Sequence, residues 1–301
     1  MVKVIALLAA LVSTVHAVET YVLHVPSRFT KDSIHDYTVT SSLLYSHKVV
    51  ADGVLVSSIV KDFDVKASGV LTVLAVNEKH SPTQVSLALG ALQVKTKAGM
   101  NNLLKVNDLL ACELGANNEI TYRINGALVD AEHRELMEAL LSLKPQGVPN
   151  DRDDVVPTTP VKVNERWKVN EGAIISRLKE QGMTDFTKLT LVSDYRFENA
   201  KTEDNVLYAV VSGTLRLSNV VPPVYPGLTV TLGTVTSQSK STYPIAGDGG
   251  SLAWSVSSAL ELQASGTVDY QNAKAKMSMR HSRLDKGQYT LTPRKNAEPP
   301  R

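Results

Sequence analysis

The sequence predicts an α+β protein in which a long, curved, half-barrel-like antiparallel sheet is covered by one or two helices. The first observation is that apolar and polar residues alternate with a period of two along most of the chain after residue 35. The second is that glycine-rich segments separate the alternating runs, as in a meander of hairpins. The third is that two stretches break this pattern with helical spacing.

The composition indicates a globular protein with a real core. Of 301 residues, 43% are hydrophobic and 21% are charged, close to the averages for soluble domains. The 32 Lys and Arg residues nearly balance the 30 Asp and Glu residues, giving a formal net charge of +2. This even balance argues against a dedicated nucleic-acid surface.

The N-terminus has the pattern of a signal peptide over residues 1–17. Lys3 precedes the apolar run Val4 to Val12, and Val15-His16-Ala17 has compact residues at the cleavage-reading positions. We expect cleavage after Ala17 and export to the periplasm or the exterior. The alternative is a retained membrane anchor, but the run is shorter than the ~20 apolar residues that span a bilayer. No transmembrane helix is expected after the signal is removed.

The segment 251–263 (SLAWSVSSALELQ) is the clearest strand. Its even positions are apolar apart from Ser258, and its odd positions are mostly serine, glutamate or glutamine. We therefore expect one half-buried face, and we take four of its residues as candidate ligand-binding positions: Leu252, Trp254, Val256 and Leu260. Ordinary core packing is the competing interpretation for Trp254 and for Trp167.

Further alternating segments predict a strand at 37–46, others through 85–89 and 228–232, and strands near 52–62, 67–78, 119–126, 161–169, 186–199, 204–218 and 266–279. In 266–279 the apolar positions change parity, which predicts a β-bulge near Gln271-Asn272. Turns are expected at Gly247-Asp248-Gly249-Gly250 and at Ala264-Ser265-Gly266. Long bulged strands twist and curl, so the sheet should be strongly curved.

Two helices are expected. Asp130 to Leu143 begins with a capping aspartate and places Leu136, Leu140 and Leu143 on one stripe. Glu171 to Gln181 is shorter and carries Ile174 and Leu178 on one stripe. Each helix has one apolar face, for which the concave face of the sheet is the obvious partner.

The residues between the helices divide the chain. Residues 145–160 are rich in proline and aspartate and predict a linker. It separates a β-rich N-terminal half (18–144, with the helix at 130–143) from a β-rich C-terminal half (161–293). Residues 294–301 predict a disordered tail. The sequence leaves open whether the halves are repeats or parts of one continuous sheet.

The segment 160–169 (PVKVNERWKV) carries a resemblance. Together with the signal, the strand and helix before the linker, and the closing meander, it resembles a set of uncharacterised exported bacterial proteins. Their second half opens with a Pro-Val-Lys-Val-Gly-(Asp/Glu)-x-Trp-like turn and strand. Asn164 stands at the glycine position, and asparagine also tolerates a left-handed turn. The resemblance implies an architecture similar to the half-barrels of periplasmic lipoprotein carriers, in which the space between sheet and helices holds acyl chains.

Residue patterns for catalysis and metal binding are missing from the sequence. The single cysteine, Cys112, lies among apolar residues and predicts a small buried side chain, so no intramolecular disulfide can form. Histidines are not spaced as metal ligands, and His133 lies on a charged helical face. Hydrolase elbows, phosphate loops and dinucleotide fingerprints do not occur. The acidic residues Asp151, Asp153 and Asp154 do not continue into a calcium loop, so a solvated linker is favoured.

These patterns together favour a non-enzymatic exported protein without cofactor or metal. We expect a binding or scaffold protein that accommodates an apolar or lipid ligand under the helices. The alternative is a structural or interaction protein of the cell envelope with the same fold and a filled core. The sequence identifies no protein partner.

Overall fold

A computed structural model describes residues 20–23, 29–78, 80–96, 104–116, 119–130, 133–141, 143, 156–157, 159–180, 183, 185–222, 224–245, 250–270 and 273–294. The predicted signal peptide lies outside these residues. So do most of the predicted linker, with Asp151, Asp153 and Asp154, and residues 295–301 of the tail.

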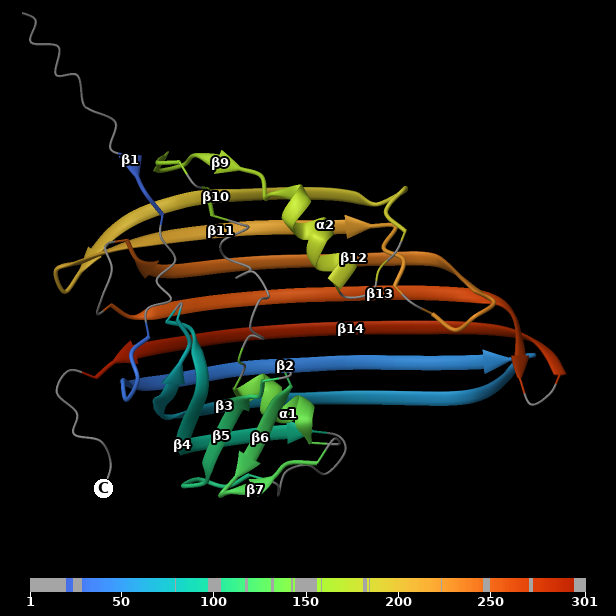
Figure 1. Ribbon diagram of the computed structural model, residues 1–301, viewed down its shortest axis with the longest axis horizontal. Helices are drawn as coiled ribbons and strands as arrows, with labels where there is room; N and C mark the ends of the chain where they lie inside the picture. Colours follow the sequence, from blue (N-terminus) through green and yellow to red (C-terminus); the bar gives the residue numbers. More distant parts are fainter. Residues whose placement is uncertain are drawn as a thin grey trace, which may run out of the picture.

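One antiparallel sheet dominates the described chain (Figure 1). Its twelve strands follow the order β7-β6-β5-β4-β3-β2-β14-β13-β12-β11-β10-β9 among the described residues. The strands of the first half are β2 (Ile34–Ala51), β3 (Val54–Val76), β4 (Pro82–Thr96), β5 (Leu109–Leu114), β6 (Ile120–Ile124) and β7 (Ala127–Leu128). Those of the second half are β9 (Arg166–Trp167), β10 (Thr190–Glu203), β11 (Val206–Ser218), β12 (Leu228–Pro244), β13 (Leu252–Tyr270) and β14 (Ala273–Pro293).

The last long strand joins the two halves. β14 pairs with β2 from His35 opposite Pro293 to Ala51 opposite Met277. Both predicted halves therefore contribute to one continuous sheet. A second, smaller sheet pairs β1 (Thr20–Tyr21) with β8 (Val161–Lys162), which ties the N-terminal segment to the start of the second half.

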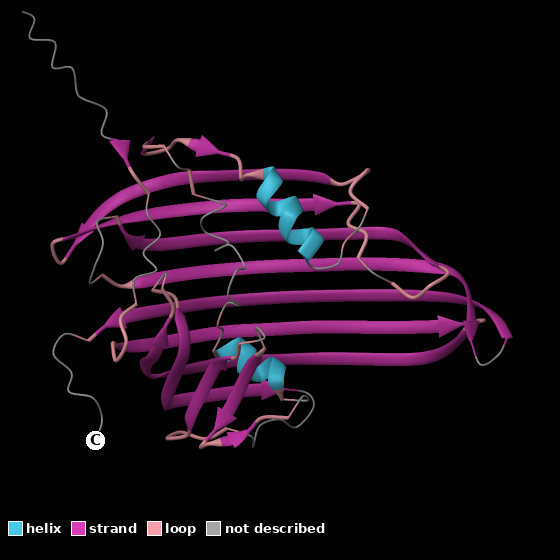
Figure 2. Cartoon of the chain, in the orientation of Figure 1, coloured by secondary structure: helices cyan, strands magenta, loops and turns pink. Residues whose placement is uncertain are grey.

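The predicted fold class is confirmed: a curved antiparallel sheet carries two helices, α1 (Arg134–Leu140) and α2 (Glu171–Glu180), within the described residues (Figure 2). Near α1, the short strands β5 and β6 run obliquely to the long strands β2 and β3, so the sheet bends at this edge (Figure 1). Register shifts between β3 and β4 at Ser68/Gly69 and Val73/Ala75 accompany this bend, as β-bulges do. Together these strands and α1 enclose the largest core, with Phe63, Leu87 and Leu110 almost fully buried.

Two predictions near residue 270 are wrong, one of a strand and one of a turn. Residues 266–279 are not one bulged strand, because β13 ends at Tyr270 and pairs there with Ala273, the first residue of β14. The change of parity therefore marks two antiparallel strands. The turn predicted at Ala264-Ser265-Gly266 is wrong as well, since these residues continue β13. Gly266 fits there because a Cβ would overlap the carbonyl oxygen of Gly227.

Two other predicted strands, 52–62 and 67–78, are a single strand, β3. The polar residues between them, such as Asp64 and Lys66, continue the alternation with Phe63 and Val65, which are buried. The prediction for residues 161–169 is wrong in the opposite sense, because one strand was expected there and two are found. The segment forms two short strands, β8 and β9, separated by a turn in which Asn164 has φ 71°, the left-handed conformation expected for it.

The first helix begins later than predicted. Its N-cap is His133, and Asp130 instead accepts a hydrogen bond from the His133 backbone N–H at 3.0 Å. The predicted burial of the helix is confirmed, because Leu136, Leu140 and the following Leu143 are all buried. The second helix agrees with its prediction to within one residue.

Candidate functional site

Both helices cover the same face of the sheet. The register connects Tyr195 to Val65 through one cross-strand row: Tyr195, Gly213, Ser239, Val256, Gly287, Ser41 and Val65. Cross-strand partners share a face. Tyr195 packs in a cluster with Ile174 and Leu178 of α2, and Val65 packs in the cluster of α1. We call this the helix-side face.

The four candidate residues Leu252, Trp254, Val256 and Leu260 all lie on this face of β13, as predicted. They form the apolar strip, which runs along the middle of the sheet between the α1 and α2 clusters. Every one of them is half-buried, whereas Val39 and Phe197, in the same cross-strand row as Trp254, are 2% and 0% exposed. The strip is therefore less completely covered than the clusters on either side.

Trp254 has a flat aromatic neighbour. Its ring stacks on that of Tyr289 from β14, with centroids 5.0 Å apart and planes inclined by 15°. Burial raises the pKa of the Tyr289 phenol, so this residue stays neutral over the physiological pH range. Leu252 packs against two core clusters and closes one end of the strip.

Charged groups border the other end of the strip. Arg283 lies opposite Leu260 and pairs with Asp285, with Nε and the carboxylate oxygen 2.8 Å apart. The hydrogen bond to Asp285 raises the pKa of Arg283, which is already a permanent cation. Lys61 and Glu135 form a second ion pair at 2.8 Å, linking β3 to α1. The helix-side face thus changes from aromatic and aliphatic side chains near Leu252 to ion pairs beyond Leu260.

The second tryptophan lies elsewhere. Trp167 of β9 stacks on Tyr195 with ring centroids 6.5 Å apart and packs beside α2. Its turn is held to β10, because Asn164 N–H donates to the Phe197 carbonyl and Phe197 N–H donates to the Glu165 carbonyl. Arg196 also donates to the Asn164 side chain. Trp167 therefore anchors the turn of the 160–169 segment and does not belong to the strip.

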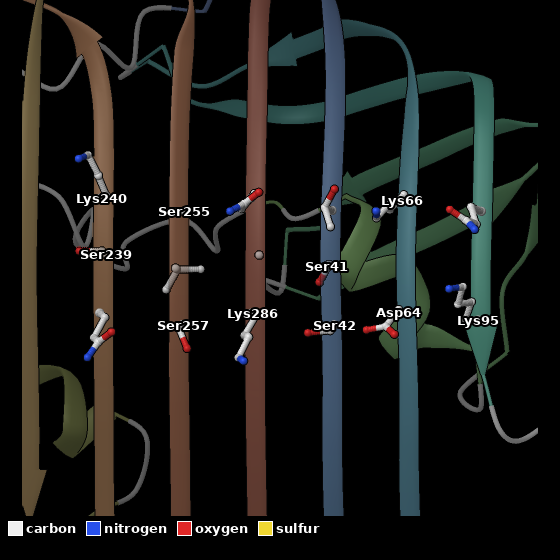
Figure 3. Close-up of a pocket in the computed structure, with 16 residues that line it drawn as sticks. Ser41, Ser42, Asp64, Lys66, Lys95, Ser239, Lys240, Ser255, Ser257 and Lys286 are labelled. Carbon is white, nitrogen blue, oxygen red and sulfur yellow. The ribbon is translucent and has the colours of Figure 1, made fainter.

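The opposite, helix-free face carries a hollow of about 830 Å³, which we call the polar groove (Figure 3). It crosses the strands from β4 to β12 and is built from two adjacent cross-strand rows whose side chains are all polar. The first row is Gln93, Lys66, Thr40, Gln288, Ser255 and Lys240; the second is Lys95, Asp64, Ser42, Lys286, Ser257 and Gln238. Between the rows lie Ser41, Ser239, Val256 and Gly287, which belong to the row of the helix-side face and contribute mainly backbone to the floor of the groove.

The polar groove has an excess of positive charge. Among the described residues that line it are four lysines and one aspartate. Lys240 pairs with Glu198 of β10 at 2.8 Å, and this hydrogen bond lowers the pKa of Glu198. Within the described part of the chain, Lys66, Lys95 and Lys286 take part in no ion pair. These three ammonium groups are left for solvent or for an anion.

The described residues form neither a metal-binding cluster nor a reactive thiol. No group of three or more His, Cys, Asp or Glu that could hold a metal ion occurs among the residues described. Cys112 is fully buried, and burial raises the pKa of its thiol to about 12, so it is not a nucleophile at neutral pH. Nor, in the described chain, is any helix long and apolar enough to cross a membrane.

Comparisons with known proteins add little. No family model matches the chain, and no curated protein matches it. Solved structures that align with it include an outer membrane channel from Pseudomonas putida F1, at 10% identity over 87% of this chain and 96% of that one, with a TM-score of 0.16. The outer membrane protein AlkL aligns at 5% identity over 91% and 98%, with a TM-score of 0.17. The P. putida toluene transporter TodX aligns at 10% identity over 92% and 94%, with a TM-score of 0.18. At these TM-scores the likeness carries no argument about function.

Sequence reasoning found the strip but missed the polar groove and Tyr289. The alternation in 251–263 was sufficient to place four residues on one face. Tyr289 lies beside Trp254 because β14 pairs with β13, and Lys286 lies beside Ser42 because β14 also pairs with β2. Neither pairing can be read from the local sequence. The available signal was the unbroken polar alternation of Thr40 with Ser42 and of Asp64 with Lys66, which marks one face without showing that it is hollow.

Proposed function

We propose that the protein is an exported, non-enzymatic binding protein that holds an apolar or lipid ligand against the apolar strip. The observation that carries the proposal is the half-buried state of Leu252, Trp254, Val256 and Leu260 between the more completely buried clusters of α1 and α2. A ligand with an acyl chain would complete the burial of these side chains, at a gain of about 25 cal/mol per Å² of apolar surface removed from water.

The aromatic pair supports the same proposal. Stacked Trp254 and Tyr289 offer a flat apolar surface of the kind that lines ligand sites, and both rings lie next to aliphatic residues of the strip. The charged border at Arg283 and Asp285 would limit how far an apolar chain extends toward that end. The competing function is a structural or interaction protein whose strip is simply the edge of a filled core.

Contact quenching of Trp254 tests the proposal. In the Trp167→Phe variant, Trp254 is the only tryptophan of the chain and so the only source of indole fluorescence. Dibrominated stearate quenches indole on contact, whereas stearate competes for the same site without quenching. We expect saturable quenching at micromolar dibrominated stearate, reversed by stearate, and a melting temperature that rises with either ligand.

Two further variants make the result specific. Val256→Arg, made in the Trp167→Phe chain, puts a charge into the strip and should abolish quenching, while Val60→Arg, at a side chain 60% exposed, should not. Circular dichroism checks that both variants remain folded. If Trp254 shows no saturable quenching in the Trp167→Phe protein and lipid leaves the melting temperature unchanged, the filled-core alternative stands.

Export is a separate part of the proposal and has its own test. The chain should be processed after Ala17 in its own host, and N-terminal sequencing of the exported protein should begin at Val18. Recovery from membranes of a chain that starts at Met1 would contradict this part and favour an anchored protein, without affecting the ligand experiment.

A further inference from the structure

We propose that the polar groove on the helix-free face binds a linear, carboxylate-bearing polysaccharide that lies across the strands from β4 to β12. This site is independent of the apolar strip, because the two occupy opposite faces of the same sheet. The first support is the hollow itself, whose two rows bring together twelve polar side chains from six strands among the described residues. A sheet face exposed only to solvent is polar as well but needs no hollow, so the concave shape is what distinguishes this face.

The spacing of the lysines fits a regular linear anion. Lys66 on β3 and Lys286 on β14, which take part in no ion pair among the described residues, are separated by one intervening strand, and Lys240, which pairs with Glu198, follows at the same interval on β12. Because neighbouring strands lie about 4.8 Å apart, the cations recur roughly every 10 Å across the sheet, and the six strands span about 24 Å. A polysaccharide in which charged and neutral sugars alternate presents its carboxylates with a comparable regularity.

The residues between the lysines suit sugars. Between Lys66 and Lys240, the first row holds Thr40, Gln288 and Ser255, and the second row holds Ser42 and Ser257 at the corresponding places. Hydroxyl and amide groups both donate and accept hydrogen bonds, as sugar hydroxyls require. The view of the groove shows Ser42, Asp64 and Lys286 close to one level on neighbouring strands, as one row (Figure 3).

Other anionic partners fit less well. Single-stranded nucleic acid is held by aromatic side chains that stack on the bases, and none of the described residues that line the groove is aromatic. A bilayer surface is flat and would contact the rims of a hollow before its floor. A soluble, narrow chain can lie along the floor and reach Lys66, Lys95 and Lys286 together.

Fluorescence anisotropy with labelled hyaluronan oligosaccharides of increasing length tests the proposal in the full-length mature protein. We expect binding that tightens with length until the oligosaccharide spans the groove and then levels off. Added salt should weaken it, because the cations are exposed. Neutral dextran of matched length should not bind.

Charge variants locate the site. Lys66→Glu with Lys286→Glu should weaken hyaluronan binding by roughly tenfold or more, since two attractive contacts become repulsive. Lys31→Glu with Lys105→Glu changes the net charge equally at exposed lysines outside the groove and should have little effect. Asp64→Asn removes the only acidic group among the described residues of the lining and should tighten binding a few-fold, a gain that damage to the fold would not produce.

Two results would overturn the proposal. One is equal weakening of hyaluronan binding by the two double variants, which would show that binding depends on net charge alone. The other is a failure of hyaluronan oligosaccharides to bind the wild-type protein at low salt. If vesicles of phosphatidylglycerol then bind in a way that depends on Lys66 and Lys286, the face is assigned to a membrane.

Discussion

The hydroxyl group of Tyr37 on β2 donates a hydrogen bond to the backbone carbonyl of Leu140, the last residue of α1, at 2.7 Å. Both residues are buried, and they are 103 positions apart in the sequence. The last carbonyls of a helix lack partners within the helix, so this bond satisfies one of them and fixes α1 on the sheet. Burial raises the pKa of Tyr37 far above its usual range, which keeps the proton on the donor.

Removing this hydroxyl should destabilise the protein measurably. Tyr37→Phe keeps the ring but leaves the Leu140 carbonyl without its partner in a buried place, at a cost of about 1–3 kcal/mol. Chemical denaturation of the wild type and the variant measures the difference. An unchanged free energy of unfolding would mean that water reaches the carbonyl and that the end of α1 is open.

Truncating the apolar stripe of α1 should have a larger effect. Leu140 is 0% exposed in the largest core cluster, so Leu140→Ala should cost about 2–5 kcal/mol. Leu128→Ala is the matched control, because Leu128 is 67% exposed on β7 and its loss should change stability by about 0.5 kcal/mol at most. Similar losses for the two variants would show that α1 is peripheral to the core.

The sequence was a good guide where one face of an element is consistently apolar. The stripe of Leu136 and Leu140 predicted the buried face of α1, and the alternation from Leu252 to Leu262 predicted which residues of β13 share a face. In such segments the period of the side chains is set by the backbone alone. In these segments the local sequence pattern is therefore enough to predict which side chains are buried.

Prediction failed where the pattern depends on distant partners. The second part of β14 passes through Ser282, Asp285 and Lys286, with polar residues on both faces, and so showed no apolar side to mark it as a strand. Its partner β2 lies more than 200 residues away in the chain, and only that pairing brings Lys286 beside Ser42. A groove made of such rows depends on register across six strands, which no local signal contains.

A close approach at Gly233 provides a test of the packing beside α2, because its neighbour Val220 belongs to the core cluster of that helix. The backbone N–H of Val220 donates to the Gly233 carbonyl at 3.0 Å, and a Cβ at Gly233 would overlap the carbonyl oxygen of Val220. Gly233→Ala should therefore push the segment around Val220, which follows β11, away from β12. The free energy of unfolding should fall by about 1–3 kcal/mol. At Gly90 a Cβ would be 3.6 Å from the nearest atom, so Gly90→Ala should be tolerated; thermal unfolding of both variants compares them directly. Equal melting temperatures would contradict the close approach.

The last prediction concerns pH and His35, which is 7% exposed and packs edge-on against Phe29 with ring centroids 5.6 Å apart. Burial lowers the pKa of His35 from its ordinary value of 6.5, so the folded protein binds this proton less readily than the unfolded chain does. By linkage, the stability that neutral His35 contributes is complete above about pH 6.5 and is lost as the pH falls through the lower folded-state pKa.

The protein should therefore become less stable on mild acidification, and His35→Gln should lose less of its stability over the same interval, because glutamine does not titrate. Glutamine also retains a polar group able to hydrogen-bond Ser33, whose Oγ lies 3.1 Å from His35 Nε2. Denaturation midpoints of both proteins, measured from neutral pH down to about pH 5, give the two slopes. His281, whose pKa is also lowered by burial and by nearby His47 and Arg283, titrates in both proteins and so cancels in the comparison. Parallel slopes for the wild type and the variant would show that His35 is accessible to protons in the folded state without cost.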